Sequence, residues 1–387
     1  MIVGIDASNL RVGGGVRHLV ELLRHAEPRD HGIDRVVVWS GRRTLEQLPE
    51  KPWLDPVPNP LLDGGLIRRV LWQHALASHL RQKRCDVLFS PGGSYLCSFR
   101  PFVTMSRNML PFEYPEMRRY GFSPMFFKLL LLRGVQAATF RNADGLIFVS
   151  EYARSVVEKV LRGGVKNAVT IPHGVDRRFY CEPKQQKAVS SCTLADPFRL
   201  LYVSDVTVYK HQWHVVAAVA DLRKDGIPGT LELIGLGYPA ALRRLRGVLD
   251  ELDPEGAFAR YIGPVPHEEL PSRYHRADLF VYASSCENLP NILLEAMASG
   301  LPIACSNRGP MPEVLGDAGI YFDPERAEDI TRVLRMLIED TGLRDRYAKS
   351  ARERARLYTW ERCARETFDF LVAVARGSSL QREVPKG

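Results

Sequence analysis

The sequence lacks paired cysteine motifs and long apolar runs. Its seven cysteines are widely scattered, with no CxxC pair of the kind that holds zinc or forms a redox centre. This usage predicts reduced thiols and a cytoplasmic location, because structural disulfides are typical of oxidising compartments. No window approaches about 18 uninterrupted apolar residues, so no segment is expected to span a membrane. The start, MIVGIDASNL, indicates a strand from residue 2 and not a secretion signal.

The sequence also lacks a nucleic-acid recognition motif. It has no zinc-finger spacing and no basic run interleaved with aromatic residues. The 53 Lys and Arg residues exceed the 45 Asp and Glu residues, giving a formal net charge of +8. This charge favours anionic partners such as sugar nucleotides or phospholipid headgroups, and nucleic acid is the least expected of them.

The length and the alternation of patterns predict two domains of α/β type. A chain of 387 residues with 45% hydrophobic residues exceeds one ordinary core. Short β-branched runs alternate with helix-period segments, which is typical of parallel strands joined by crossover helices. We expect two doubly wound, Rossmann-like sheets, with strands at 2–5, 36–39, 87–89, 102–105, 146–149 and 169–171, then at 200–203, 231–234, 261–263, 279–282, 303–305 and 320–322.

A polar segment divides the two halves. Residues 181–197 carry Pro near both ends and show no periodicity, so they are expected to form a linker. The domains would then be 1–180 and 198–355. In the final segment, 356–387, apolar spacing predicts an amphipathic helix, with Phe368, Leu371, Val372 and Ala375 on one face.

The most informative stretch is residues 284–324, which follows an expected strand. Glu287 lies in the strand-to-helix loop, Asn288 is a candidate cap, and Pro290 suits a first helical turn. Glu295 is then expected about two turns into this helix. A helix entered in this way offers free backbone N–H groups and the positive end of its dipole, which together bind phosphate.

Two carboxylates therefore flank a candidate phosphate site. Glu287 and Glu295 are eight residues apart, so one could accept a hydrogen bond from a ribose diol and the other from sugar hydroxyls. Taken alone, the two residues would more readily be interpreted as solvated helix-end charges, as most Glu residues are. The context decides between these interpretations, through Glu295-Ala296-Met297, Gly300 and Pro302, then Pro312-Glu313-Val314 and Gly316-Asp317-Ala318-Gly319.

With this context the chain resembles the retaining glycosyltransferases of family 4, also called glycosyl transferases group 1, which carry a Glu-x7-Glu signature. The resemblance implies the GT-B fold, in which two Rossmann-like domains face an interdomain cleft. The donor site would lie in the C-terminal domain and the acceptor side in the N-terminal one, and the last helix would cross back to the N-terminal domain. Glu295 would hold the donor ribose and Glu287 would contact the transferred sugar. Further donor contacts would come from Asn288, Leu289, Pro290, Asn291 and Val265.

The resemblance also implies the reaction. A sugar would move, with retention, from GDP-mannose or a UDP-sugar to a glycan or lipid-linked acceptor, without a metal or other cofactor. The expected setting is the synthesis of a bacterial surface polysaccharide or lipopolysaccharide. Two alternatives remain open: a GT-B relative that hydrolyses or epimerises a nucleotide-sugar, and a catalytically silent binding subunit.

A second match lies in LLYVSDVTVYKHQ, which begins at residue 200. Lys210 stands where the family places a basic residue beneath the donor diphosphate, and would neutralise charge as the nucleoside diphosphate leaves. The alternative is an exposed lysine at a helix start. Asp205 departs from the pattern, because many members carry Arg at this place. One cationic contact is therefore missing or supplied by another residue, and the silent-subunit alternative stays open.

The first loop places Gly13, Gly14 and Gly15 between a strand and a helix, where backbone N–H groups can approach an anion closely. It is not a dinucleotide fingerprint, since His18 occupies the place of the third glycine. By resemblance this loop reaches the donor phosphates and the acceptor, and the alternative is a tight turn only.

Two further residues of the first half bear on its chemistry. Arg107 precedes Asn108 where many relatives carry His, so a role for His cannot be transferred there, and Arg107 could instead bind an anionic group. His173 is interpreted as a loop residue of the cleft and not as a catalytic base.

Residues 118–141 combine aromatic residues and a run of leucines with five basic residues. One interpretation is a buried helix. The other is a contact with the inner membrane surface, which would suit a lipid-linked acceptor.

Overall fold

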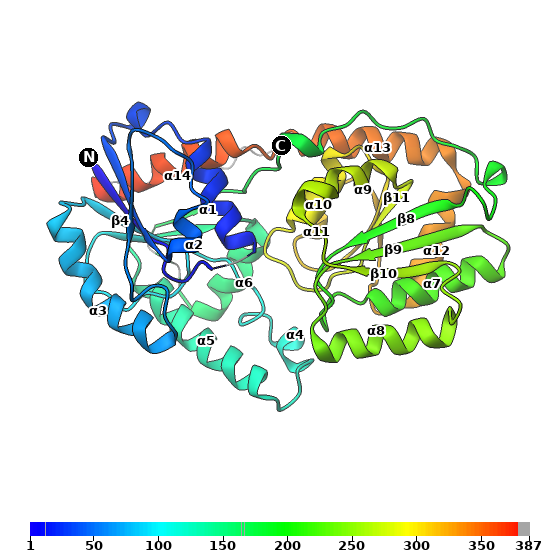
Figure 1. Cartoon of the computed structure of the whole chain (residues 1–387), viewed down its shortest axis with the longest axis horizontal. Coiled ribbons are helices and arrows are strands. Elements are labelled where there is room, and N and C mark those ends of the chain that lie inside the picture. Colours follow the sequence, from blue (N-terminus) through cyan, green and yellow to red (C-terminus); the bar gives the residue numbers. More distant parts are fainter. Residues whose placement is uncertain (12, 164, 166, 378–387) are drawn as a thin grey trace. The chain divides into compact units, whose positions relative to one another are not determined.

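The computed structural model describes residues 1–11, 13–163, 165 and 167–377, which divide into two compact units (Figure 1). Unit 1 contains Met1–Glu113, Ser123–Gly174 and the chain from Thr359 onward. Unit 2 contains Tyr114–Phe122 and Val175–Tyr358. Each unit is built on its own parallel sheet, as the alternating sequence pattern predicts.

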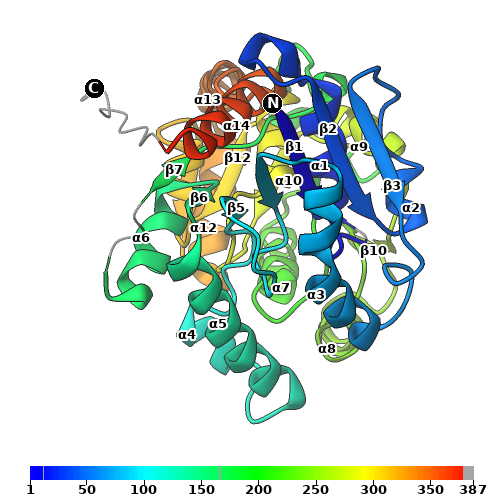
Figure 2. The ribbon, with the colours of Figure 1, turned by 90° about the vertical axis from the view of Figure 1, so that its left-hand side faces the viewer.

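Unit 1 holds a seven-stranded sheet in the order β3-β2-β1-β4-β5-β6-β7. Figure 2 shows β3, β2 and β1 side by side. The strands are β1 (Ile2–Asp6), β2 (Arg35–Ser40), β3 (Leu54–Pro58), β4 (Val87–Ser90), β5 (Phe102–Met105), β6 (Gly145–Phe148) and β7 (Ala168–Thr170). The six expected strands are confirmed. The sequence reading missed β3 because it contains Pro56 and Pro58, which a strand tolerates at a sheet edge, the place that β3 occupies.

The helical segments of unit 1 lie between these strands in the chain and after the last of them. They are α1 (Gly14–Arg24), η1 (Pro28–His31), α2 (Arg42–Leu45), α3 (Leu66–Gln82), α5 (Pro124–Asn142), α6 (Glu151–Leu161) and α14 (Trp360–Ala375). The last of these contacts α1 and the central strands β4, β5 and β6. Its residues Phe368, Leu371 and Val372 are buried, as the apolar spacing predicts, and Ala375 is half-buried at the end of the helix.

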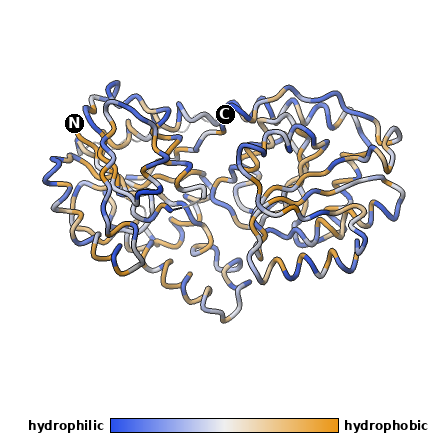
Figure 3. Tube along the Cα trace, in the orientation of Figure 1, coloured by the Kyte–Doolittle hydropathy of each residue, from blue (hydrophilic) through white to orange (hydrophobic). Residues whose placement is uncertain are grey.

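Unit 2 holds a six-stranded sheet in the order β10-β9-β8-β11-β12-β13. The strands are β8 (Phe198–Val203), β9 (Gly229–Ile234), β10 (Ala259–Gly263), β11 (Leu279–Tyr282), β12 (Ile303–Ser306) and β13 (Ile320–Phe322). All four residues of β11 and of β12 are buried, and Figure 3, in the orientation of Figure 1, shows hydrophobic stretches in the sheet of unit 2. Such runs are typical of parallel strands covered on both faces.

The strand order of unit 2 reverses at β8. The chain proceeds outward from β8 to β9 and β10, then returns to place β11 on the other side of β8. In open α/β sheets, ligands bind outside the carboxyl ends of the strands at such a switch point. The helical segments around this sheet are α4 (Tyr114–Arg118), η2 (Arg177–Phe179), η3 (Val189–Ser191), α7 (Gln212–Lys224), α8 (Pro239–Leu252), η4 (His267–Glu269), α9 (Leu270–Arg276), α10 (Asn291–Ala298), α11 (Met311–Leu315), α12 (Ala327–Glu339) and α13 (Thr341–Ala355).

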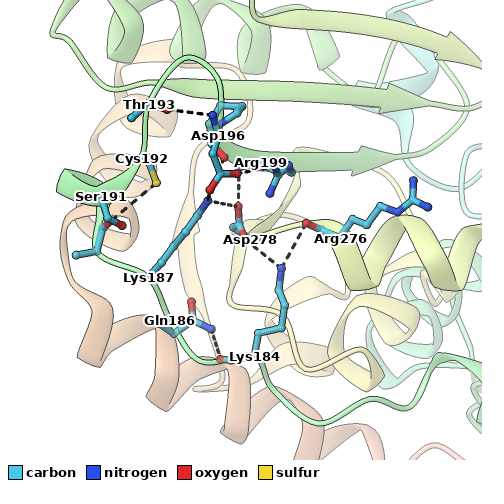
Figure 4. A network of polar contacts seen from close by, with 12 residues as sticks. Lys184, Gln186, Lys187, Ser191, Cys192, Thr193, Asp196, Arg199, Arg276 and Asp278 are labelled. Carbon is cyan, nitrogen blue, oxygen red and sulfur yellow. Dashed lines mark hydrogen bonds and ion pairs between the residues drawn. The ribbon is translucent and has the colours of Figure 1, made fainter.

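The segment expected to be a linker, 181–197, packs along unit 2 (Figure 4). The Lys184 ammonium lies 3.0 Å from the Asp278 carboxylate, and Lys187 lies 3.3 Å from Asp196. The passages between units instead follow Glu113, Phe122, Gly174 and Tyr358. The segment is held by ion pairs and hydrogen bonds of its polar side chains and not by an apolar face, which agrees with the lack of hydrophobic periodicity in its sequence.

Arg344 of α13 fastens this segment from the inside. Its side chain is fully buried and donates hydrogen bonds to the carbonyls of Leu337 (2.7 Å) and Ile338 at the end of α12. It also donates to Gln186 Oε1 (3.1 Å) and to the carbonyl of Lys187. One guanidinium therefore satisfies carbonyls at a helix end, which lack intrahelical donors, and carbonyl and amide oxygens of the packed segment.

We expect Arg344→Ala to lower the free energy of unfolding by about 3 kcal/mol or more, because it leaves several buried oxygens without donors. Arg344→Lys should recover little of this loss, since an ammonium cannot reproduce the planar fork. Denaturant titration of the purified protein measures both effects. Lys349→Ala, which removes an exposed lysine on the same helix, serves as the control and should change stability by less than about 0.5 kcal/mol. If the Arg344→Ala protein is as stable as this control, the hydrogen bonds of Arg344 do not stabilise the fold as described.

Candidate functional site

Two loops at the switch point of unit 2 bring together Lys210 and Glu287. Lys210 follows β8 and Glu287 follows β11, and their side chains form an ion pair. Tyr282, the last residue of β11, donates its hydroxyl proton to Glu287 Oε1 and accepts a hydrogen bond from Lys210 Nζ at 3.0 Å. Ser284 Oγ donates to the same Glu287 oxygen at 2.7 Å. The two residues singled out in the sequence therefore meet in one hydrogen-bonded cluster.

Tyr282 stays protonated in this cluster. Complete burial, followed by the nearby Glu287 charge, raises the pKa of the Tyr282 hydroxyl well above its ordinary value. The hydroxyl can therefore act as a donor to Glu287 throughout the physiological range. With this donor in place, the buried pair does not depend on the Coulomb attraction alone.

Glu295 has a separate set of partners. Its carboxylate lies 3.3 Å from His267 Nε2 and accepts a hydrogen bond from the Tyr274 hydroxyl at 3.3 Å. The ring of Phe179 packs edge-on against both His267 and Tyr274, with centroids 5.3 and 5.6 Å away. The Glu295 side chain is 5% exposed, so it is not a solvated helix-end charge.

The helix that carries Glu295 begins later than the sequence analysis expected. Pro290 is the residue before the first turn of α10 and has an extended backbone, so Asn291 is the first helical residue. The capping position forms no side-chain hydrogen bond, and Asn288, the expected cap, lies two residues before it. Counted from Asn291, Glu295 is the fifth residue of the helix, about one turn in and not two. Gly300 follows the end of the helix with φ of 63°, as expected of a helix-terminating glycine.

Most of the remaining residues expected to contact the donor lie close to these two carboxylates in the chain. Leu289 and Pro290 are buried in the loop between Glu287 and α10, while Asn291 is half-buried at the start of the helix. Val265 lies in the loop after β10, two residues before His267.

Asp205 has a structural bond of its own. The side chain is exposed at the end of β8, and its Oδ1 accepts a hydrogen bond from the backbone N–H of Leu236 at 3.2 Å. It thereby joins the loop after β8 to the loop after β9. Asp205 therefore contributes a negative charge with a structural hydrogen bond at this end of the sheet.

His211 flanks Lys210 and is held neutral. Its Nε2 lies 3.0 Å from the hydroxyl of Ser285, two residues before Glu287. Desolvation by burial, aided by the positive charge of Arg119, lowers the pKa of His211 to about 3.

In unit 1 the glycine-rich loop opens α1. Gly13 stands before the helix with φ of 73°, a conformation that favours glycine. Arg107 donates to the carbonyl of Gly14 at 2.9 Å and lies 3.5 Å from that of Gly15. Desolvation lowers the pKa of Arg107 to about 10, so the guanidinium remains charged at neutral pH. The loop and a cation thus lie together.

His173 belongs to an aromatic cluster in unit 1. Its ring stacks on Trp360 with centroids 5.8 Å apart, and the ring of His18 meets Trp360 edge-on at 5.5 Å. Burial lowers the pKa of His18 well below its ordinary value, so this histidine is neutral. A packing role fits His173, which is 7% exposed.

Sequence reasoning missed four side chains that contact the two carboxylates: Tyr282 and Ser284 at Glu287, and His267 and Tyr274 at Glu295. The first two adjoin the Glu-x7-Glu stretch and could have been found as polar residues at the carboxyl end of a strand. The other two lie on a different loop and helix, and nothing in their local sequence marks them.

Among the described residues, no group of three or more His, Cys, Asp or Glu side chains is arranged to hold a metal ion. The metal-free reaction stays a prediction. No helix in this part of the chain is both long and apolar enough to cross a bilayer. None of the seven cysteines, all of which lie in the described part of the chain, forms a disulfide.

The fold defines a class. The two units, each a parallel α/β sheet with helices around it, have the GT-B architecture. Sucrose-phosphate synthase from Thermosynechococcus elongatus has this fold, with a TM-score of 0.75 at 18% identity, over 98% of this chain and 100% of that one.

Family models resolve the class further. The model "Glycosyltransferase Family 4" matches residues 12–179, and "Glycosyl transferases group 1" matches residues 185–354. The chain belongs to this family of glycosyltransferases.

Two curated relatives show the range of similarity. O-antigen chain mannosyltransferase B from Escherichia coli is 36% identical over 139 residues, 34% of this chain and 36% of that protein. Glycogen synthase from Mycobacterium tuberculosis is 25% identical over 251 residues, 64% of this chain and 58% of that protein. The matches thus span about a third and somewhat over half of these relatives.

His211 predicts an acid-sensitive contribution to stability. Its folded pKa of about 3 lies below the ordinary 6.5, so as the pH falls below about 6.5 the unfolded chain binds a proton that the folded chain does not. Stability from this group is complete above pH 6.5, and about 1 kcal/mol is lost by pH 5.5. Thermal melting should therefore show a smaller drop between pH 7.5 and 5.5 for His211→Gln than for the wild type.

The Gln side chain keeps an N–H donor for Ser285 but does not titrate in this range. His74→Gln, at an exposed position, is the control and should retain the wild-type pH dependence. Equal pH dependence of His211→Gln and wild type would show that His211 does not titrate as described.

Proposed function

We propose that this protein transfers a hexose, with retention of anomeric configuration, from GDP-mannose or a UDP-sugar to a glycan or lipid-linked acceptor. The observation that carries the proposal is the Lys210–Glu287 pair, held by Tyr282 at the switch point of unit 2. The pair and Glu295 supply a cation and two anchored carboxylates in the place where such sheets bind ligands.

Each group has a role in this proposal. Glu295, fixed by His267 and Tyr274, accepts hydrogen bonds from the ribose diol. Glu287 contacts the hydroxyls of the transferred sugar. Lys210 stabilises the negative charge that develops on the diphosphate as the glycosidic bond breaks. The N-terminus of α10 adds backbone N–H groups and a partial positive charge.

Unit 1 contains a further candidate for anion binding. The Gly13–Gly15 loop and the Arg107 guanidinium beside it offer N–H donors and a cation to an anionic group of donor or acceptor. The similarity to an O-antigen chain mannosyltransferase favours mannose as the sugar and surface polysaccharide or lipopolysaccharide synthesis as the setting.

Two substitutions separate binding from turnover. In calorimetric titrations with GDP-mannose, UDP-glucose and UDP-GlcNAc, we expect one donor to bind the wild type, and Glu295→Ala to weaken it by about 10-fold or more, because the ribose loses a charged acceptor. Lys210→Met should still bind the nucleoside diphosphate, yet lower kcat by about 100-fold or more, since it removes stabilisation of the leaving group.

Glu328→Ala is the matched control, because it removes an exposed glutamate of the same unit. If the bound donor is hydrolysed but never transferred to any acceptor, the protein is a hydrolase. Donor binding without turnover would identify a silent subunit. If Glu295→Ala binds the donor as tightly as the wild type, Glu295 does not take part in donor binding.

We further propose that α5 lets the enzyme act at the cytoplasmic face of an anionic membrane, where a lipid-linked acceptor would lie. The helix has two sides. Phe126 and Leu129 are buried, whereas Phe127 is 57% and Leu131 70% exposed, with the exposed Lys128 between them. The buried side agrees with a packed helix, and the exposed side is the surface that the proposed membrane contact would use. An exposed apolar strip with a cation is the chemistry that binds anionic lipid surfaces.

Replacing Phe127 and Leu131 together by Ser should weaken binding to vesicles that contain phosphatidylglycerol by about 10-fold or more, because less apolar surface can enter the bilayer. Co-sedimentation measures the bound fraction. The double replacement Met336→Ser and Leu357→Ser removes exposed apolar residues of unit 2 and should leave binding unchanged. If both double variants bind the vesicles equally well, this face of α5 does not contact the membrane.

A further inference from the structure

The loops that carry Lys210 and Glu287 are joined by one buried residue, Ser285. Its backbone N–H donates to the carbonyl of Tyr209 at 2.8 Å, and its hydroxyl lies 3.0 Å from His211 Nε2. Tyr209 and His211 are the two neighbours of Lys210 in the chain, and Ser285 precedes Glu287 by two residues. Ser285 therefore links the two loops that carry the paired charges, through its backbone and through its side chain.

The direction of the hydrogen bonds follows from the single proton of the Ser285 hydroxyl. The nearest acceptor is Glu116 Oε2 at 2.7 Å, and the Tyr209 carbonyl is farther away at 3.3 Å. If the proton is donated to Glu116, His211 Nε2 must carry a hydrogen and donate to Ser285. His211 is neutral, so it has one such hydrogen to give. The chain of donors runs from His211 through Ser285 to the Glu116 carboxylate.

Glu116 comes from a segment that is separate in sequence from the rest of unit 2. Residues Tyr114–Phe122 interrupt unit 1 but pack in unit 2, where the Glu116 side chain is almost completely buried. Arg119 of this segment donates to both Glu116 oxygens, at 2.7 and 3.1 Å, and to Glu325, at 2.7 and 3.0 Å. This bidentate pairing holds the Glu116 carboxylate in place.

We propose that Glu116 is a positioning residue for the transfer reaction: acting through Ser285, it sets the geometry of the Lys210–Glu287 pair. The inference rests on the proposed function, because it assigns Glu116 to that same site. Glu116 itself has no place among the donor contacts. Its effect passes through the Ser285 hydroxyl to the loops that hold Tyr209, His211 and Glu287.

A nucleophilic triad is a poor description of these three side chains. In such a triad the histidine lies between the serine and the carboxylate and accepts the serine proton. Here Ser285 lies between His211 and Glu116, donates to the carboxylate, and is 4% exposed. The arrangement suits the fixing of loops and not an attack on substrate.

If Glu116 positions the pair, its replacement should affect kcat and not the affinity for a nucleoside diphosphate. Glu295 and its partners His267 and Tyr274 lie outside this network, so affinity for a nucleoside diphosphate alone should not depend on Glu116. Interactions that act in the transition state, those of Lys210 and Glu287, depend on it. Small displacements of catalytic groups cost large factors in rate. We expect Glu116→Gln and Ser285→Ala each to lower kcat by about 10-fold or more, with affinity for GDP or UDP within about twofold of wild type.

A double-mutant cycle tests whether Glu116 acts through Ser285. Steady-state kinetics with GDP-mannose or UDP-glucose, whichever binds, are measured for wild type, both single variants and the double variant. If Glu116 acts through Ser285, the double variant should be no slower than the slower single variant. Ser285→Thr, which keeps the hydroxyl, should restore at least part of kcat, and Glu325→Gln, at the exposed end of the network, should keep kcat within about twofold.

The outcomes separate this inference from the proposed function. Unchanged kcat in Glu116→Gln, multiplicative losses in the double variant, or a parallel loss of GDP or UDP affinity would each overturn the inference while transfer by the wild type still stands. If the wild type binds donor but transfers nothing, the proposed function fails. The inference is then decided by calorimetry: Glu116→Gln should weaken the intact donor relative to GDP or UDP alone, and an unchanged ratio overturns it. Melting temperatures check that each variant is folded.

Discussion

The arrangement of unit 2 depends on keeping a lysine and a glutamate paired away from water. Removing two charges from solvent is costly, and their attraction offsets this cost only when hydrogen bonds satisfy the remaining atoms. Tyr282 and Ser284 supply such bonds to Glu287, and Tyr282 also accepts one from Lys210. The pair is therefore possible only where the two loops that carry it are held rigidly at one edge of the sheet.

The sheet topology provides that edge. β8 and β11 are adjacent and parallel, so the loops that leave their carboxyl ends begin side by side. Ser285 then joins the loops through the Tyr209 carbonyl, and burial keeps His211 neutral, so His211 adds no positive charge beside Lys210. Strand order, burial and hydrogen bonding therefore all help to hold the Lys210–Glu287 pair in place.

The sequence predicted the parts of this arrangement that local pattern encodes. Apolar runs located the six strands of unit 2, and the spacing of Glu287 and Glu295, read with the family resemblance, located both carboxylates. Local sequence pattern could not predict the tertiary contacts of the site. Glu116 is 169 residues from Ser285 and His267 is 28 from Glu295, so only the folded chain brings them together. Pro58 ends a strand, and Pro290 precedes a helix that was expected to include it, because a fixed φ is compatible with several structures.

The pairing of Lys210 with Glu287 also bears on how the proposed reaction would use its binding energy. The Lys210 ammonium is paired with the Glu287 carboxylate, so a donor diphosphate would have to compete with Glu287 for it. In the proposed reaction, a nucleotide-sugar in its ground state would therefore gain little from Lys210. As the sugar departs, negative charge grows on the diphosphate and strengthens its attraction for the ammonium relative to that of Glu287. An interaction that is weak in the ground state and strong in the transition state raises kcat, which is the property that the proposed role of Lys210 requires.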